Sequence, residues 1–231
     1  MAIDQLSPQY QNTAVGTETR NRVLRNTYGL LALSMIPTVI GAWIGVATRF
    51  SFFAGSPAIS FIAFLAIAWG FMFGISRYRN SSAGILLLLG FTFFMGLMLS
   101  RLLGYVLGMA NGTSIVMMAF GSTAAIFGVM ATIATVSKRD FSGMGSWLFI
   151  GMIVILLAAF ANIFLQLPGM MLAISALATV VFSLYILFDL NRIVTGGETN
   201  YVMATLSVYI SLYNVFSNLL ALFGLGGGSN D

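Results

Sequence analysis

Residues 143–166 read GMGSWLFIGMIVILLAAFANIFLQ and carry no charged side chain. A helix needs about 20 apolar residues to cross the ~30 Å hydrocarbon core of a bilayer, because each residue rises ~1.5 Å. Other stretches of the chain are similarly long and apolar. The expected spans lie near residues 27–48, 57–76, 83–108, 113–136, 143–166, 169–191 and 202–223.

The composition indicates that lipid surrounds most of the chain. Hydrophobic residues are 59% of the 231 residues and charged residues are 7%, and the mean hydropathy is +0.97. A soluble domain carries roughly a quarter charged residues. Backbone polar groups in lipid must bond internally, and long apolar runs are not typical of a barrel. We therefore predict an all-α, polytopic membrane protein with seven transmembrane helices.

The expected organisation is a single transmembrane domain with a short segment at each end. Residues 1–26 are polar and are predicted to form a mobile cytoplasmic N-terminal tail. Residues 27–224 form the seven-helix domain, and residues 225–231 form a short flexible C-terminal tail. The loops are only a few residues long, so they leave no room for a soluble catalytic module.

Basic residues are distributed unevenly among the expected loops. If seven helices alternate in direction, only Arg49 falls in a loop on one side, and eight basic residues fall on the other side. These eight are Arg20, Arg22, Arg25, Arg77, Arg79, Lys138, Arg139 and Arg192. Because cytoplasmic loops carry excess Lys and Arg, the N-terminus is predicted in the cytoplasm and the C-terminus outside. The pI of about 9.7 then reflects topology, and no nucleic-acid partner is expected.

Missing residue types exclude several kinds of chemistry. The chain has no Cys and no His, so disulfides, thiolate metal sites and a Ser–His pair are impossible. An aspartyl intramembrane protease needs two carboxylates, but Asp189 is the only acidic residue within an expected span. The only lysine, Lys138, lies in a loop, which excludes a retinal linkage. We expect a protein that is not an enzyme and that has no resident cofactor.

Asp189 is the leading candidate for an ion-binding or pH-sensing residue. Burial in a medium of low dielectric constant disfavours the charged form of a carboxylate. In a chain without His, Asp189 could therefore sense protons or hold Ca²⁺ weakly. The alternative is an interfacial pair with Arg192, which lies three residues later on the same helix. The sequence leaves both interpretations open.

The last span carries a polar stripe, with spacing i, i+4, i+7 and i+11, which places its members on one helix face. The members are Ser207, Ser211, Asn214 and Asn218. Polar side chains that face lipid are costly, so this stripe should face protein or water. Hydrogen bonding between helices and the lining of a pathway both satisfy this requirement.

Three further polar residues are candidates for supporting roles. Arg101 lies in or near the outer end of the third span, where it could pair with a distant acid or extend to the interface. Asn162 and Gln166 lie one turn apart at the end of the fifth span. They could add polar lining, or they could simply close a packed helix end.

Glycine pairs at four-residue spacing predict close helix contacts. They are Gly41 and Gly45, Gly70 and Gly74, and Gly104 and Gly108. Such pairs could form a dimer interface, but contact within the bundle is the expected use in a seven-helix protein.

Four short segments carry a resemblance to a known family. They are residues 24–28 (LRNTY), 161–168 (ANIFLQLP), 196–201 (GGETNY) and 211–214 (SLYN). In this order they resemble the Bax inhibitor-1 (transmembrane BAX inhibitor motif) superfamily, and in particular its bacterial YccA-like branch. The resemblance implies seven helices with the last enclosed by the other six, in the bacterial inner (plasma) membrane.

The resemblance implies two functions. The YccA-like branch implies a modulator and interaction partner of FtsH, a membrane-anchored ATP-dependent protease of the AAA type. The flexible cytoplasmic N-terminus is then the segment with which the protease interacts. The superfamily implies instead a pH-sensitive calcium leak with one Asp on helix six and another on helix seven. Asp189 matches the first Asp, but Ser211 stands at the second, with Asn214 as a neutral neighbour. Since Ca²⁺ prefers several oxygen ligands, we expect weak binding or permeation of a cation rather than tight binding.

Overall fold

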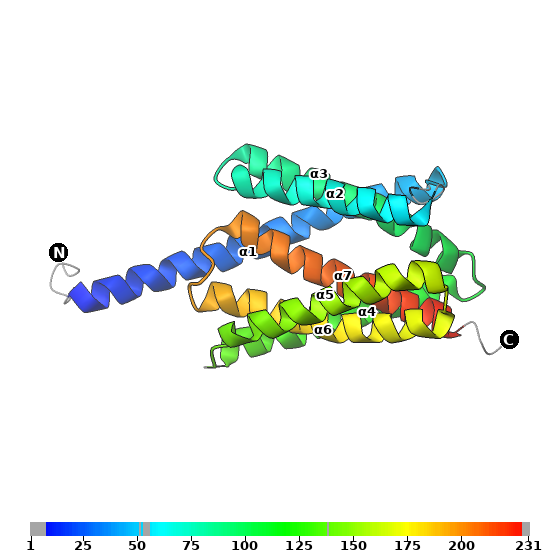
Figure 1. The fold of residues 1–231 in the computed structure, drawn as a ribbon. Helices are drawn as coiled ribbons and strands as arrows, with labels where there is room; N and C mark the ends of the chain where they lie inside the picture. The colour runs from blue at the N-terminus through cyan, green and yellow to red at the C-terminus, as the bar shows by residue number, and fades with distance from the viewer. Residues whose placement is uncertain (1–7, 51, 53–55, 138, 228–231) are drawn as a thin grey trace.

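The computed structural model describes residues 8–50, 52, 56–137 and 139–227, shown in Figure 1. These residues are almost entirely helical. The elements are α1 (Pro8–Ala47), α2 (Pro57–Arg77), α3 (Ser82–Leu107), α4 (Gly112–Val136), the 3-10 turn η1 (Ser142–Met144), α5 (Gly145–Leu165), α6 (Pro168–Val194) and α7 (Tyr201–Gly227). All seven α-helices in the described part of the chain are long and apolar enough to cross a membrane. The predicted all-α architecture with seven spans is confirmed.

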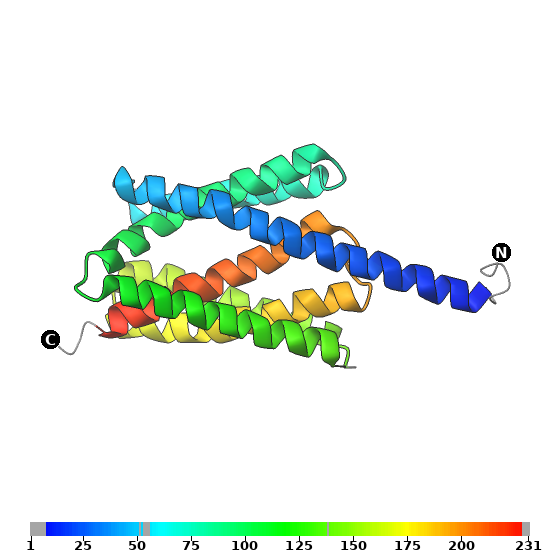
Figure 2. The same cartoon turned by 180° about the vertical axis from the view of Figure 1, so that it is seen from behind.

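The α1 helix begins well before the predicted first span. It runs for 40 residues, or ~60 Å, and its N-terminal part projects beyond the other helices in both views (Figures 1 and 2). Residues 8–26, which the sequence assigned to a tail, are thus part of α1. Extension of a packed helix costs little compared with nucleation, and Val23, Leu30 and Leu31 anchor this one in the core. Whether the segment moves stays a prediction, and residues 1–7 lie outside the described residues.

The last helix also extends beyond the predicted boundary of the seven-helix domain. The α7 helix continues to Gly227, past the end of the domain predicted at residue 224. Residues 228–231 lie outside the described residues, so the predicted flexible tail is described only at its start.

The bundle has two groups of helices with α7 between them. Figure 1 shows α1, α2 and α3 on one side of α7, and α4, α5 and α6 on the other. The α7 helix contacts α1, α2, α3, α4 and α6. Every residue from Tyr201 to Leu225 is at least partly buried. Along the described chain, however, α5 makes no contact with α7, so enclosure of the last helix by all six others is not confirmed.

Close packing of α1 on α3 explains one of the glycine pairs. A Cβ atom added at Gly41 would collide with the backbone oxygen of Phe93, and one added at Gly96 would collide with that of Thr38. Gly45 similarly lies directly against Ser100. The Gly41–Gly45 pair therefore makes a contact within the bundle, where only glycine allows the two backbones to approach so closely.

One end of the bundle carries most of the charge. The helices α2, α4 and α6 end here, and α3, α5 and α7 begin here. The projecting part of α1 lies at the same end (Figure 1). We call it the basic end. Its described arginines are Arg20, Arg22, Arg25, Arg77, Arg79, Arg139 and Arg192. Lys138 lies outside the described residues. The side of the membrane that the basic end faces stays a prediction.

Candidate functional site

Asp189 and Ser211 come together where α6 packs on α7. The Ser211 hydroxyl donates a hydrogen bond of 3.3 Å to Oδ2 of Asp189. The two residues are 8% and 3% exposed. Asp189 lies five residues before the end of α6, or ~7.5 Å along the helix axis from the basic end. The two positions that the family resemblance marks on helices six and seven are therefore in contact, although their function is not tested.

The helical period places Asp189 inside the bundle. Ile186, Leu190 and Ile193 recur at three- or four-residue spacing around it and are essentially fully buried. These apolar side chains hold this face of α6 against α7, the helix with which it makes its most extensive packing. The carboxyl group therefore points into the contact between helices and away from lipid.

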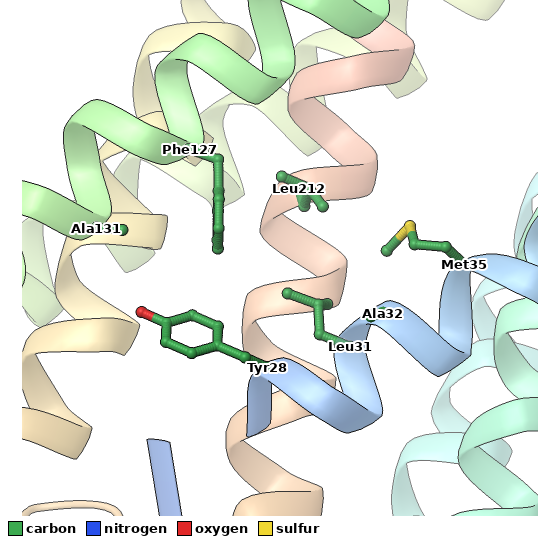
Figure 3. A pocket seen from close by; sticks show the side chains of 7 residues that line it. All are labelled: Tyr28, Leu31, Ala32, Met35, Phe127, Ala131 and Leu212. Carbon is green, nitrogen blue, oxygen red and sulfur yellow. The ribbon is translucent and has the colours of Figure 1, made fainter. Parts of the chain in front are cut away.

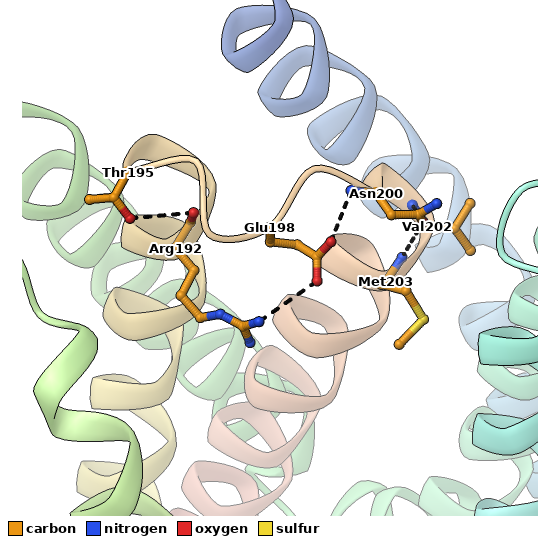
Figure 4. Close-up of polar contacts among 6 residues, drawn as sticks. All are labelled: Arg192, Thr195, Glu198, Asn200, Val202 and Met203. Atoms are coloured by element: carbon orange, nitrogen blue, oxygen red, sulfur yellow. Dashed lines mark hydrogen bonds and ion pairs between the residues drawn. The ribbon is translucent and has the colours of Figure 1, made fainter. Parts of the chain in front are cut away.

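Arg192 does not form the predicted pair with Asp189. Its Nη2 atom lies 3.9 Å from Oε2 of Glu198, and this is the only ion pair that the described residues form. The guanidinium also lies 5.7 Å from the ring centroid of Phe188. Asp189 contacts Ser211 of α7. The longer Arg192 side chain, 39% exposed, instead reaches Glu198 of the loop, as Figure 4 shows.

The loop between α6 and α7 closes the basic end near Asp189. Its Asn200 side-chain oxygen accepts hydrogen bonds from the backbone N–H groups of Val202 and Met203, both 3.1 Å long. The Asn200 amide donates to Oδ1 of Asn80 at 2.7 Å, which joins the loop to the turn between α2 and α3. The Glu198 carboxylate accepts from the Asn200 N–H at 2.8 Å, as Figure 4 shows. Arg192, Glu198 and Asn200 thus fix the loop.

Sequence reasoning missed the contacts made by this loop and two buried polar residues. Asn200 directly before an apolar run is a recognisable N-cap signal, so its role could have been found. Asn191 is buried; it accepts from the Phe141 N–H at 3.0 Å and donates to the Arg139 carbonyl at 3.3 Å. Tyr209 is also buried, and a tyrosine in the middle of a span needs a partner for its hydroxyl.

Two members of the predicted polar stripe on α7 form their hydrogen bonds with backbone carbonyl groups of the same helix. The side-chain amide of Asn214 donates to the Ile210 carbonyl and that of Asn218 donates to the Asn214 carbonyl, both at 2.8 Å. Ser207 is half-buried. Only Ser211 reaches Asp189. Ser211 is buried and the other three residues are partly buried, and a pathway lined by all four stays a prediction.

The other three candidates lie toward the opposite end of the bundle. The Asn162 side chain accepts a hydrogen bond of 3.0 Å from the Leu167 N–H. Gln166 ends α5 in the left-handed region with φ 51°. Both residues close a helix end, which is one of the two roles that the sequence left open for them. Arg101 is exposed on α3, and its extension to the interface stays a prediction.

The donor set around Asp189 is too small for a high-affinity calcium site. Ca²⁺ takes six to eight oxygen ligands and usually more than one carboxylate. The described residues contain no group of three or more His, Cys, Asp or Glu side chains that could hold a metal ion. Glu198, the nearest acid along the chain, is paired with Arg192. Weak cation binding at Asp189 stays a proposal.

The fold and this site define a class of protein: a multi-pass membrane protein with one carboxyl group buried between its last two spans. The family described as Inhibitor of apoptosis-promoting Bax1 matches residues 20–228. An uncharacterized protein of Neisseria meningitidis serogroup A is 38% identical over 214 residues, which are 91% of this chain and 94% of that protein. The Modulator of FtsH protease YccA of Escherichia coli K12 is 38% identical over 204 residues, or 88% of this chain and 90% of YccA.

The chain therefore belongs to the Bax inhibitor-1 family. Its likeness to YccA confirms the resemblance read from the four short segments. A second YccA protein, from Escherichia coli O6:H1, is described as an inner membrane protein.

Proposed function

We propose that this protein modulates a membrane-anchored ATP-dependent protease of the FtsH type in the bacterial inner membrane and is not itself an enzyme. The observation that carries this proposal is its similarity to YccA, which is described as a modulator of FtsH protease and which this chain covers to 90% of its length. The short loops and seven spans of the described chain agree with a role exerted through protein contacts.

The projecting part of α1 is the surface that we assign to the protease. The first span is expected near residues 27–48, while α1 itself starts at Pro8. Residues 8–26, or ~28 Å of helix, therefore extend beyond the expected span. With the basic end in the cytoplasm, as the arginine distribution predicts, this extension is presented there.

Co-purification with the native protease tests the proposal. Deletion of residues 1–17 leaves the span of α1 and the contact of Arg20 with the Val194 carbonyl intact. We expect the full chain to retain the protease and the deletion to lose most of it. Deletion of residues 228–231 is the matched control and should retain it. Failure of the full chain to retain the protease would contradict the proposal.

A proton-gated cation leak is the second candidate, and the buried Asp189–Ser211 contact favours it. A carboxylate buried with a single hydrogen-bond donor costs several kcal/mol in its charged form unless a cation compensates. Reversal of a two-state population needs only ~5.5 kcal/mol. Binding or release of one proton or cation at Asp189 is thus energetically sufficient to gate a change in helix packing.

Cation flux into proteoliposomes distinguishes this candidate. Flux is measured between about pH 5 and pH 8 for the native chain and Asp189→Asn. Carboxyl groups in poorly solvated sites of proteins change protonation within this range. Asp140→Asn changes an exposed carboxylate at the same end and serves as the control. We expect flux that depends on pH and is altered only by Asp189→Asn. Absence of flux, or identical flux in all three proteins at every pH, would contradict a leak that is gated at Asp189.

A further inference from the structure

A long apolar groove runs between α1 and α4, on a different face from the Asp189 site. Two cavities of about 450 and 540 Å³ form it. Met35 and Leu212 line both cavities, so the two adjoin each other along α1 and α7. The backbones of α1 and α4 make no contact along the described chain, and Figure 2 shows α7 behind the space between them. Figure 3 shows Tyr28 and Phe127 on its two walls and Leu212 on its floor.

The groove is nearly as long as the hydrocarbon core is thick and opens sideways. On α1 its lining runs from Tyr28 to Val46, which is ~27 Å of helix, compared with ~30 Å of hydrocarbon. Two of its rim residues, Val39 on α1 and Phe120 on α4, are 66% and 70% exposed. In a bilayer this opening faces lipid.

The lining favours an apolar occupant over water. The hydroxyl of Thr123 already donates to the Ala119 carbonyl at 2.7 Å, and that of Tyr213 to the Met95 carbonyl at 3.1 Å. The hydroxyls of Thr38 and Tyr209 bond to each other at 2.8 Å. Since water needs two or more free polar partners to stay in a cavity, this lining offers it little.

The volume favours a hydrocarbon chain over a second helix. A helix with its side chains is at least ~10 Å wide, so one that crosses the hydrocarbon core fills roughly 2,400 Å³. The larger cavity, at about 540 Å³, is several times smaller. An extended acyl chain is narrow enough to lie in it.

The Arg25 side chain lies at the basic end of the groove. Arg25 precedes Tyr28 by three residues and Ala32 by seven, so it lies on the helix face that lines the groove. Arg25 is exposed and forms no ion pair within the described part of the chain. Arginine binds phosphate oxygens with two parallel hydrogen bonds. Arg22 is also exposed, but its spacing places it off this face.

We propose that the groove between α1 and α4 binds one acyl chain of an anionic phospholipid whose phosphate is held by Arg25. The apolar walls and the lateral opening select the chain. Arg25, at the basic end of the groove, selects the charge of the headgroup. This site is independent of the protease and leak proposals above.

Electron paramagnetic resonance on reconstituted protein tests the site. The probes are phosphatidylglycerol and phosphatidylcholine, each spin-labelled on an acyl chain, in phosphatidylcholine vesicles. We expect a slowly exchanging, motionally restricted component that is larger for phosphatidylglycerol. Arg25→Gln should lower the preference for phosphatidylglycerol about fivefold, as loss of one arginine near an anionic headgroup predicts. Arg22→Gln is the matched control and should leave the slowly exchanging component unchanged.

Steric variants separate the groove from the general lipid surface. Ala32→Trp fills the groove from α1 and should abolish the restricted component for both lipids. Leu33→Trp places the same ring on the neighbouring exposed face and should not change it. Ala131→Phe fills the groove from α4 and replaces Ala32→Trp if that variant does not fold. The proposal would be overturned if the motionally restricted component were equal in groove and control variants. It would also be overturned if the spectra showed only lipid in contact with the general protein surface.

A partner helix in the groove is the remaining outcome. A thiol introduced as Ala32→Cys would then be protected from labelling only when a second protein co-purifies, and no restricted lipid would be detected. That result would also overturn the lipid assignment.

Discussion

The Tyr209 hydroxyl lies 2.8 Å from Oγ1 of Thr38 and joins α7 to α1 inside the bundle. The Thr38 hydroxyl also lies 2.8 Å from the Ser34 carbonyl, and the Tyr209 hydroxyl lies 3.4 Å from the Thr92 carbonyl of α3. The Tyr209 ring also packs edge-on against Phe91 of α3, with centroids 6.2 Å apart. One side chain of α7 therefore connects both helices of the tightly packed α1–α3 pair.

Tyr209→Phe should destabilise the protein only modestly. The variant loses the bond to Thr38 but keeps the ring, and such bonds in membrane proteins average ~0.6 kcal/mol and reach ~1.7 kcal/mol. Tyr209→Ala should cost about 3–5 kcal/mol, because it also leaves a cavity. Thermal unfolding in detergent measures both changes. Tyr105→Phe, at an exposed position, should have no effect; a similar loss there would contradict this assignment.

Gly96→Ala and Gly70→Ala should have opposite effects on stability. At Gly96 the new methyl would collide with the backbone of Thr38, whereas at Gly70 nothing lies within 4 Å. The first substitution should force α1 and α3 apart and lower the unfolding temperature. The second should raise stability slightly, since alanine exceeds glycine in helix propensity by up to ~1 kcal/mol. Unfolding temperatures of the two variants under identical conditions test this prediction. Equal values would show that the close approach of α1 and α3 at Gly96 does not contribute to stability.

Asn200→Ala should destabilise the basic end more than Glu198→Gln does. Asn200 caps α7 and bonds to Asn80, and loss of an N-cap costs about 1 kcal/mol. Glu198 pairs with the partly exposed Arg192 at 3.9 Å, and such a pair contributes ~0–1 kcal/mol. Hydrogen exchange of the amides that open α7 measures the difference. Greater exchange in Glu198→Gln would reverse the ranking.

The orientation in the membrane can be measured with single cysteines, because the chain has none of its own. Ser137 lies beyond the end of α4 at the basic end, and Gly169 begins α6 at the opposite end, with open space around it. Ser137→Cys should react with a membrane-impermeant reagent from the cytoplasmic side, and Gly169→Cys from the outside. Reaction of both thiols from the same side would overturn the topology.

The fold class could be predicted because it depends on composition and run length. Segments such as residues 143–166 are too long and apolar to be anything other than spans, so the number of helices and their order were correct. The start of α1 was not predicted, because polar residues such as Asn21 and Asn26 neither favour nor forbid a helix that is already anchored by tertiary contacts. The helical period also placed Ser211 inward, but it could not show which residue of α6 it meets.

The sequence by itself determined seven spans, a single acidic residue within the expected spans and an arginine-rich end, because these follow from counts and spacing along one chain. Only the tertiary structure decided that Asp189 meets Ser211 while Arg192 turns to Glu198. It also decided that α1 and α4 stand apart to leave a groove. Contacts of this kind depend on the rotation and separation of whole helices, which the packing of backbones such as those at Gly41 and Gly96 sets.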